Sequence, residues 1–377
     1  MRKVIIVNCF ETFQERVENI FKYFQNKGLD VSIIQSDFMH FKKQHVVEEK
    51  ENYTFIKSKP YYNNISVDRI FSHMKFARDT FEVIEKLTVQ PDLIYVILPP
   101  NSLAKRAIKY KAKNTNTKIV FDVIDLWPEA FTMGNSKMTM FLKPWKRIRS
   151  QNLNKSDFVI TECNYFRNVL KKELLDVKNE TLYLTKADSN TKIKPNLSED
   201  GIHMLYLGSI NNIIDINLIV NFLSKTNKKK KVIFHIIGDG ENRENLIKEI
   251  SNQGIEYIYH GLVYDSQKKQ EIINECHFGI NIMRENIAVG LTMKSIDYFQ
   301  FGLPIINNIQ EDTEKIVEIN EVGLNITTES IDSVIEKING YSTEKIVEMK
   351  FKSGDIFDKY FSVTAFSDKL DEIFYRF

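Results

Sequence analysis

Short apolar strands alternating with helices occur twice along this chain, and this alternation constrains the fold more than any other feature. In the first half the expected strands are Lys3–Val7, Asp30–Ile34, Asp92–Leu98, Lys118–Asp122 and Phe158–Thr161. Helical stretches separate them, and such alternation is typical of βαβ units with a parallel sheet. The first half is therefore expected to form one α/β domain.

The second half repeats the pattern. Its expected strands are Met204–Gly208, Val232–Ile237, Tyr257–His260 and Phe278–Met283. Ligands of open α/β sheets bind at the carboxyl ends of the strands. The sequence thus predicts two Rossmann-like domains that face an interdomain cleft holding the active site.

A polar, turn-rich stretch lies between these halves and marks the expected domain boundary. The predicted limits are a first domain at 1–187, a linker at 188–200, a second domain at 201–358 and a C-terminal helix at 359–377. We expect that helix to cross back to the first domain.

Charge and cysteine usage exclude several classes of protein. The net charge of the 377 residues is only +2, which gives no support to nucleic-acid binding. Cys9, Cys163 and Cys276 are isolated, which indicates neither a zinc site nor a disulfide framework. No run is long and apolar enough to span a membrane, so we expect a cytoplasmic protein of undetermined oligomeric state.

The most informative motif is Gly290–Ile306, which places a loop, a helix and a strand in quick succession. Thr292 is a candidate N-cap, and Lys294 falls in the first turn of the helix. A helix N-terminus with a lysine suits a diphosphate, because its free N–H groups and its dipole favour anions. Asp297, about one turn further on, suits the diol of a ribose.

Two glycine turns follow expected strands of the second half. One is Gly208-Ser209 and the other is Gly238-Asp239-Gly240. Glycine lets a phosphate or a sugar approach the backbone closely, but it also suits a tight turn between strand and helix. Both interpretations are open for each turn.

The first half offers fewer polar candidates. Asp125 follows a strand end, where it would orient a substrate hydroxyl or act as a base, whereas Asp122 has apolar neighbours and is expected to be a buried structural group. His73 lies on an expected helix, with either a substrate role or a packed, structural one. His40, His45, His203 and His277 lack ligand spacing and are expected to be structural.

Residues 138–149 combine apolar and basic side chains. Phe141, Leu142 and Trp145 are clustered among four Lys or Arg residues, a pattern found at the membrane interface. The pattern is also compatible with a packed loop and a solvated basic helix face. We favour peripheral contact with the inner membrane face.

Taken together, these motifs resemble the family 4-like glycosyltransferases of GT-B fold, of the bacterial capsule or exopolysaccharide type. The resemblance covers most of the chain. It is carried by Asp122–Glu129, Tyr206–Ser209, Ile237–Glu241, His260–Val263 and above all Gly290–Ile306.

The resemblance implies that the second domain binds a nucleotide-diphosphate sugar. Asp297 would take the place of the glutamate that holds the ribose hydroxyls, and Lys294 would hold the diphosphate. The implied donor-binding residues are Gly208, Ser209, Gly238, Asp239, Gly240, Gly261, Leu262, Val263, Gly290, Leu291, Thr292, Lys294 and Asp297.

The first domain would then hold the acceptor, through Cys9–Thr12, His73 and Asp125. The candidate catalytic residues are His73, Asp125, Arg284, Glu285 and Lys294. The chain departs from the family in two ways: Val289 stands eight residues before Asp297, where the family has a glutamate, with Glu285 further upstream, and Ser209–Asp215 contains no basic residue. Arg284 or Lys294 would compensate.

The absence of an Asp-x-Asp pair argues against a metal-bound diphosphate, so we expect no metal and no cofactor apart from the donor substrate. The predicted activity is sugar transfer to a glycan or a polyprenyl-diphosphate-linked acceptor, with retention of configuration, in cell-surface polysaccharide synthesis. A nucleotide-sugar epimerase of the same architecture and a non-catalytic partner of another glycosyltransferase are the alternatives.

Overall fold

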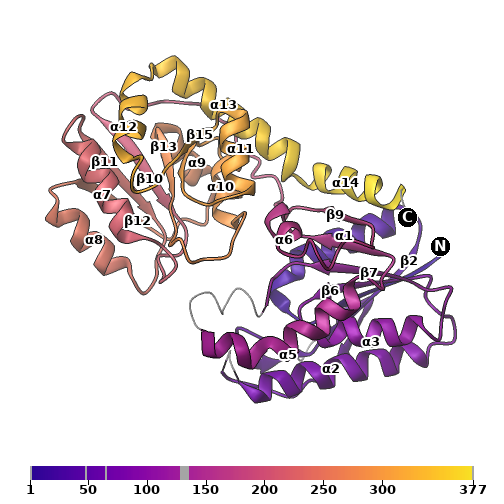
Figure 1. Ribbon diagram of the computed structural model, residues 1–377. Coiled ribbons are helices and arrows are strands. Elements are labelled where there is room, and N and C mark those ends of the chain that lie inside the picture. The colour runs from indigo at the N-terminus through magenta and orange to yellow at the C-terminus, as the bar shows by residue number, and fades with distance from the viewer. Residues whose placement is uncertain (1, 47–48, 64–65, 128–135, 376–377) are drawn as a thin grey trace. The chain divides into compact units, whose positions relative to one another are not determined.

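The computed structural model describes residues 2–46, 49–63, 66–127 and 136–375, with the backbone alone at 136–141. The chain divides into two compact units (Figure 1). The first consists of Met1–Leu184 and Phe366–Phe377, and the second of Thr185–Ala365.

The described part of the first unit contains a parallel sheet with strand order β5-β2-β1-β6-β7-β8-β9. Its strands are β1 (Lys3–Asn8), β2 (Asp30–Ser36), β5 (Tyr53–Ile56), β6 (Leu93–Leu98), β7 (Lys118–Val123), β8 (Phe158–Thr161) and β9 (Asn179–Thr181). The central strand β6 is buried along its whole length, as its uninterrupted apolar sequence requires.

The helices among its described residues are η1 (Glu11–Phe13), α1 (Gln14–Asn26), α2 (Val67–Glu85), α3 (Ser102–Lys111), α5 (Ser136–Leu153), α6 (Asn164–Val169) and α14 (Val363–Tyr375). Figure 1 shows α2, α3 and α5 lying together. A small antiparallel pair, β3 (Phe38–Met39) and β4 (Gln44–His45), stands apart from the sheet.

The prediction that the C-terminal helix returns to the first domain is confirmed. Helix α14 places Phe366, Leu370 and Ile373 at i, i+4 and i+7, and these side chains are part of the core of the first unit. The hydroxyl of Tyr23 on α1 also donates a hydrogen bond of 2.7 Å to Asp371.

The second unit is built in the same way. Its described strands are all parallel, in the order β12-β11-β10-β13-β14-β15. They are β10 (Ile202–Leu207), β11 (Val232–Ile237), β12 (Glu256–Gly261), β13 (Phe278–Asn281), β14 (Ile305–Asn307) and β15 (Gly323–Asn325). Its helices are α7 (Ile216–Asn227), α8 (Arg243–Asn252), α9 (Ser266–Glu275), α10 (Met293–Gln300), α11 (Asp312–Asn320), α12 (Ile331–Gly340) and α13 (Thr343–Tyr360).

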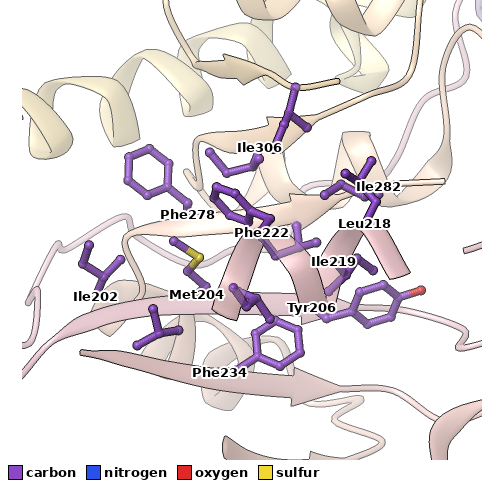
Figure 2. Close-up of a cluster of buried hydrophobic side chains, with 14 of the residues drawn as sticks. Ile202, Met204, Tyr206, Leu218, Ile219, Phe222, Phe234, Phe278, Ile282 and Ile306 are labelled. Atoms are coloured by element: carbon purple, nitrogen blue, oxygen red, sulfur yellow. The ribbon is translucent and has the colours of Figure 1, made fainter. Parts of the chain in front are cut away.

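A core between the sheet and its helices stabilises this unit (Figure 2). Met204, Phe234 and Phe278 come from adjacent strands, and Phe222 reaches them from α7. Burial of a large apolar side chain contributes roughly 1.5–3 kcal/mol each. The strands are therefore held firmly, and their carboxyl ends form a fixed edge.

The predicted linker residues 188–200 belong to the second unit and pack on it. Thr191 Oγ1 donates a 2.8 Å hydrogen bond to Gln270 on α9. The side chain of Ile193 fills the space beside Gly302 and Gly354, where an added Cβ would come within 2.5 Å and 2.4 Å of it. Apolar contact of this kind ties the segment to the unit surface.

Candidate functional site

A pocket of about 640 Å³ opens at the carboxyl ends of β10, β11 and β12. Every residue that lines it belongs to the second unit. They are Leu207, Gly208, Ser209, Ile237, Gly238, Asp239, Gly240, Leu262, Val263, Tyr264, Lys269 and Asp297. The structure thus brings together eight of the residues that the sequence assigned to donor binding.

Close backbone packing explains why positions 238 and 240 of this pocket are glycines. The φ angle of Gly238 is +146°, and a Cβ added there would lie 1.9 Å from the carbonyl oxygen of Gly208. Likewise, a Cβ at Gly240 would lie 2.3 Å from the carbonyl oxygen of Ile210. The two turns pack backbone against backbone, with a hydrogen bond of 2.9 Å from the Ile210 N–H to the Asp239 carbonyl. Both turns also line the pocket.

Helix α10 begins as the sequence predicts. Thr292 is its N-cap, and its Oγ1 accepts a 3.0 Å hydrogen bond from the Ser295 N–H. The preceding loop is fixed from the other side, because the carbonyl of Gly290 accepts hydrogen bonds from the N–H and the hydroxyl of Thr313. Gly290 and Leu291 are buried.

Lys294 is held inside the unit by an aromatic ring. Its Nζ lies 3.9 Å from the ring centre of Tyr206 and donates a 2.8 Å hydrogen bond to the hydroxyl of the same residue. Burial lowers the pKa of Lys294 to about 7. Its Cε would lie 3.6 Å from a Cβ added at Gly208, which places the side chain beside the pocket.

Tyr206 connects the core to this site. Figure 2 shows its ring at the border of the core cluster, with the hydroxyl directed away from it. That hydroxyl donates a 2.7 Å hydrogen bond to the Ser209 carbonyl, and burial raises the pKa of Tyr206. Sequence reasoning named Tyr206 within the resemblance but gave it no role in the site, because its position on β10 is that of an ordinary core residue.

Asp297 lines the pocket and forms an ion pair with Lys186. The two side chains are 20% and 25% exposed, respectively. Lys186 was missed because it lies in the polar stretch between the two halves. Tyr264 and Lys269 also line the pocket and were not predicted from the sequence. The side chain of Tyr264 is 83% exposed, and the ammonium of Lys269 lies 5.2 Å from the ring centre of Phe301.

Arg284 and Glu285 follow β13 and are exposed. The Arg284 N–H donates a 2.9 Å hydrogen bond to the Ile213 carbonyl, and its Nε lies 3.4 Å from the carbonyl oxygen of Ile214. Neither residue lines the pocket, although Arg284 borders the loop between β10 and α7. Gly261, at the end of β12, accepts a hydrogen bond from the Gly238 N–H and so supports the pocket floor.

In the first unit, His73 lies on α2 and is 1% exposed. The rings of Phe10, Tyr61, Trp127 and Trp145 lie 5.3 to 6.5 Å from it. Within the described ranges, neither ring nitrogen has a hydrogen-bond partner. Burial lowers the pKa of His73 well below its usual value, so the imidazole is neutral at pH 7.

Charged groups gather around that histidine. The Arg69 guanidinium lies 5.5 to 5.9 Å from the ring centres of Phe10, Tyr61 and Trp127. Burial lowers the pKa of Arg69, and the negative charge of the half-buried Asp125 opposes that effect. The predicted candidates His73 and Asp125 are therefore both close to Arg69, a residue that sequence reasoning did not select.

The segment Cys9–Thr12 follows β1. Cys9 is 6% exposed, and burial raises the pKa of its thiol. The Glu11 carboxylate accepts 2.7 Å hydrogen bonds from the backbone N–H groups of His40 and Phe41. This segment thus anchors the β3–β4 pair.

Asp122 is buried, as its apolar flanks predict. It accepts a 2.7 Å hydrogen bond from Arg16 Nε and another of 2.7 Å from the Tyr95 hydroxyl. A fully paired buried carboxylate has a structural role here.

The expected membrane contact by the cluster of Phe141, Leu142 and Trp145 is wrong for the last two residues. Leu142 is 3% exposed and Trp145 is 6% exposed, because both pack against Trp127 on the inner face of α5. The side chain of Phe141 lies outside the described residues. Among the helices described, none has the length and apolar character needed to cross a bilayer.

Comparison with known proteins agrees with this architecture. Residues 201–343 match the family described as glycosyl transferases group 1. The match lies within the second unit and supports the predicted class of enzyme, a glycosyltransferase.

A stretch of 95 residues is 23% identical to the chitobiosyldiphosphodolichol beta-mannosyltransferase of Candida glabrata. That stretch is 25% of this chain and 21% of the yeast protein.

Two solved structures resemble the whole chain. One is the lipopolysaccharide outer core galactosyltransferase WaaB, with a TM-score of 0.69 and 15% identity. The other is Anabaena Alr3699/HepE in complex with UDP, with a TM-score of 0.66 and 12% identity. Both alignments cover 100% of each chain. At these identities the likeness concerns the fold, and the predicted GT-B fold is confirmed.

Proposed function

We propose that this protein is a retaining, metal-independent glycosyltransferase that uses a nucleotide-diphosphate sugar as donor. The observation that carries the proposal is the pocket of the second unit. Glycine turns, Asp297 and the helix that presents Lys294 meet there at the carboxyl ends of parallel strands. The pocket lies within the domain that matches group 1 glycosyltransferases.

In this proposal Asp297 accepts hydrogen bonds from the ribose hydroxyls. Lys294 and the N–H groups at the start of α10 hold the diphosphate. The pKa of Lys294 is about 7 in the free protein, so a large fraction of the side chain is neutral at pH 7. A diphosphate beside it favours the protonated form and raises that pKa.

The reaction breaks the bond between the anomeric carbon and the diphosphate oxygen. The acceptor hydroxyl oxygen bonds to the anomeric carbon on the same face, and its proton passes to the departing diphosphate oxygen. Lys294 stabilises the negative charge that develops on the leaving group. No side-chain base is needed for this route.

Uridine nucleotides are the first donors to test, because the HepE structure contains UDP. Leu262, Val263 and Tyr264 line the end of the pocket that follows β12 and would lie near the base. The exposed ring of Tyr264 offers a stacking surface for it.

We further propose a glycan or polyprenyl-diphosphate-linked acceptor at the cytoplasmic face of the membrane, for cell-surface polysaccharide synthesis. The name of the Candida glabrata relative includes a lipid diphosphate, which supports an acceptor of that class. Neutral, buried His73 and the nearby Asp125 are the acceptor-side candidates in the first unit.

Membrane contact is supported by charge. Helix α3 contains four Lys or Arg residues, and α5 adds the exposed Lys143 and Arg147, whereas its Arg149 is buried. Neither helix contains Asp or Glu. Between these helices and α2 lies a groove of about 520 Å³ lined by Lys105, Arg106, Lys109 and the exposed Met74. Such a surface attracts anionic lipid headgroups, with about 1 kcal/mol for each basic residue near the membrane.

Titration calorimetry with UDP, GDP and ADP tests the donor assignment. We expect one nucleotide to bind, and EDTA to leave its affinity unchanged. Binding of none of the three would contradict the proposal and favour the non-catalytic partner.

Activity is tested with a radiolabelled nucleotide sugar, with and without a lipid-linked saccharide. A product that forms only with the acceptor, with the anomeric configuration of the donor by NMR, is expected. Epimerised nucleotide sugar without an acceptor would instead indicate the epimerase.

A further inference from the structure

The ion pair between Lys186 and Asp297 occupies the carboxylate that the proposed function assigns to the ribose. Both side chains are largely shielded from solvent, at 25% and 20% exposure. An ion pair at this depth is stronger than a pair on the open surface. In the free protein the Asp297 carboxylate therefore already has a cationic partner.

Lys186 belongs to the segment through which the chain enters the second unit, since the boundary between the units falls after Leu184. Its N–H donates a 3.0 Å hydrogen bond to the Phe361 carbonyl, which also accepts 2.6 Å from Thr185 Oγ1. Lys186 also forms an isolated parallel bridge with Ser362. The entering segment is thus fixed to the segment that leaves the unit.

A second contact joins the same helix to the same segment. Gln300 Nε2, on the last turn of α10, donates a 2.6 Å hydrogen bond to the Ala187 carbonyl. Helix α10 consequently carries the proposed donor-binding residues Lys294 and Asp297 and also contacts the entering segment. The Lys186–Asp297 pair joins the donor-binding residue to that segment directly.

We propose that Lys186 is a positioning residue of the donor site, whose ion pair with Asp297 is exchanged for the ribose diol when nucleotide binds. The ammonium and the diol hydroxyls are all donors, and they compete for the same partly buried carboxylate. Nucleotide binding therefore releases the Lys186 side chain from α10. The segment through which the chain enters the second unit therefore loses a contact with α10 when the donor pocket is occupied. The inference rests on the proposed function.

The first test is the reactivity of the Lys186 amine toward N-hydroxysuccinimidyl acetate, quantified by peptide mass spectrometry. Saturation of the wild-type protein with UDP should increase acetylation of Lys186 about threefold or more. The exposed Lys192 serves as the internal reference. Saturation with 2′,3′-dideoxyuridine diphosphate, which has no diol, should leave Lys186 unchanged. Equal acetylation with and without UDP would overturn the inference.

The second test is a substitution. Because the competitor is removed, Lys186→Met should bind UDP about three- to tenfold more tightly, with unchanged affinity for the dideoxy analogue. Lys192→Met is the matched control and should behave as the wild type. Weaker binding of both nucleotides by Lys186→Met, at an unchanged unfolding temperature, would mean a purely structural lysine and contradict the exchange.

These outcomes separate the inference from the proposed function. If the wild-type chain binds none of UDP, GDP and ADP, the proposed function fails and the inference fails with it. If UDP binds but Lys186 keeps its reactivity, the donor site stands and only the exchange is refuted.

Discussion

The two units share one architecture, but the candidate site of the second is shaped mainly by backbone and that of the first mainly by side chains. In the second unit the pocket is shaped by backbone, at Gly208, Gly238 and Gly240, and its charged side chains already have internal partners. In the first unit, His73 is enclosed by aromatic side chains. A backbone-built pocket suits a constant diphosphate, whereas a side-chain-built site can change with the acceptor.

The largest effect is expected where backbone shapes the pocket. Gly238→Val places a Cβ 1.9 Å from the Gly208 carbonyl oxygen and should destabilise the second unit by about 3 kcal/mol or more. Gly254→Ala is the control, because its φ of +65° is left-handed but nothing lies within 4 Å, and it should cost only about 1 kcal/mol. Urea unfolding followed by circular dichroism measures the free energy of unfolding of both variants. Equal losses of stability would mean that the turns at Gly208 and Gly238 shift at little cost to make room for the side chain.

A second contrast concerns histidines. Within the described residues the ring nitrogens of His73 have no hydrogen-bond partner, whereas His203, His235 and His260 form a continuous row. His203 Nδ1 lies 2.8 Å from His235 Nε2, and His235 Nδ1 lies 3.0 Å from His260 Nε2. Asp200 terminates the row at 2.8 Å from His203 Nε2.

This row predicts acid sensitivity of the second unit. Burial lowers the pKa of His235 to about 4 in the folded state, against 6.5 in an unfolded chain. Protonation therefore favours the unfolded state, and stability should fall as the pH drops below 6.5. His235 alone contributes a loss of about 2 kcal/mol at pH 5. His235→Gln should remove that share of the slope in urea unfolding between pH 7.5 and 5, and an unchanged slope would contradict this reading.

The pH dependence of UDP binding has the opposite sign and a smaller size. Lys294 must be protonated to hold the diphosphate, and its pKa of about 7 in the free protein is raised in the complex. Affinity should accordingly fall by up to about tenfold per pH unit above pH 7 until the pKa of the complex is reached. Calorimetry in buffers of different ionisation enthalpy should detect proton uptake, and its absence at pH 8 would show that Lys294 does not change its protonation.

The smallest effect is expected at the rim of the pocket. Tyr264 is 83% exposed, so Tyr264→Ser should leave the fold intact and weaken UDP binding about five- to tenfold through lost stacking. Tyr264→Phe should retain affinity. A matched control is Tyr375→Ser, which changes a residue that is 93% exposed and belongs to the first unit. If Tyr264→Ser binds as the wild type, the base lies elsewhere.

Sequence reasoning predicted the centres of both sheets and the edge strand β12, but it missed β5, β9 and β15. Strands β5, β9 and β15 have only three or four residues and are partly exposed, so they lack the buried apolar run that identifies β6. Of the pocket, the glycine turns and Asp297 were predictable from local motifs. Lys186 and Tyr264 were not, because their roles depend on contacts across the fold or on the shape of the pocket.

The error at Trp145 has a similar cause. A cluster of apolar and basic residues does not reveal which side of a helix faces the core. Trp127, which packs against Trp145, is distant in the sequence. Only the packing of α5 shows that Leu142, Trp145 and even Arg149 are buried.

The central claim is that the pocket of the second unit binds a nucleotide diphosphate through Lys294 and Asp297. Calorimetry at pH 7 with UDP and uridine, on the wild type, Lys294→Met and Asp297→Ala, tests it most directly. The account predicts that Lys294→Met loses about 10- to 100-fold in affinity for UDP but little for uridine, whereas Asp297→Ala weakens both. Equal losses for UDP and uridine in Lys294→Met, or unaltered binding in both variants, would contradict it.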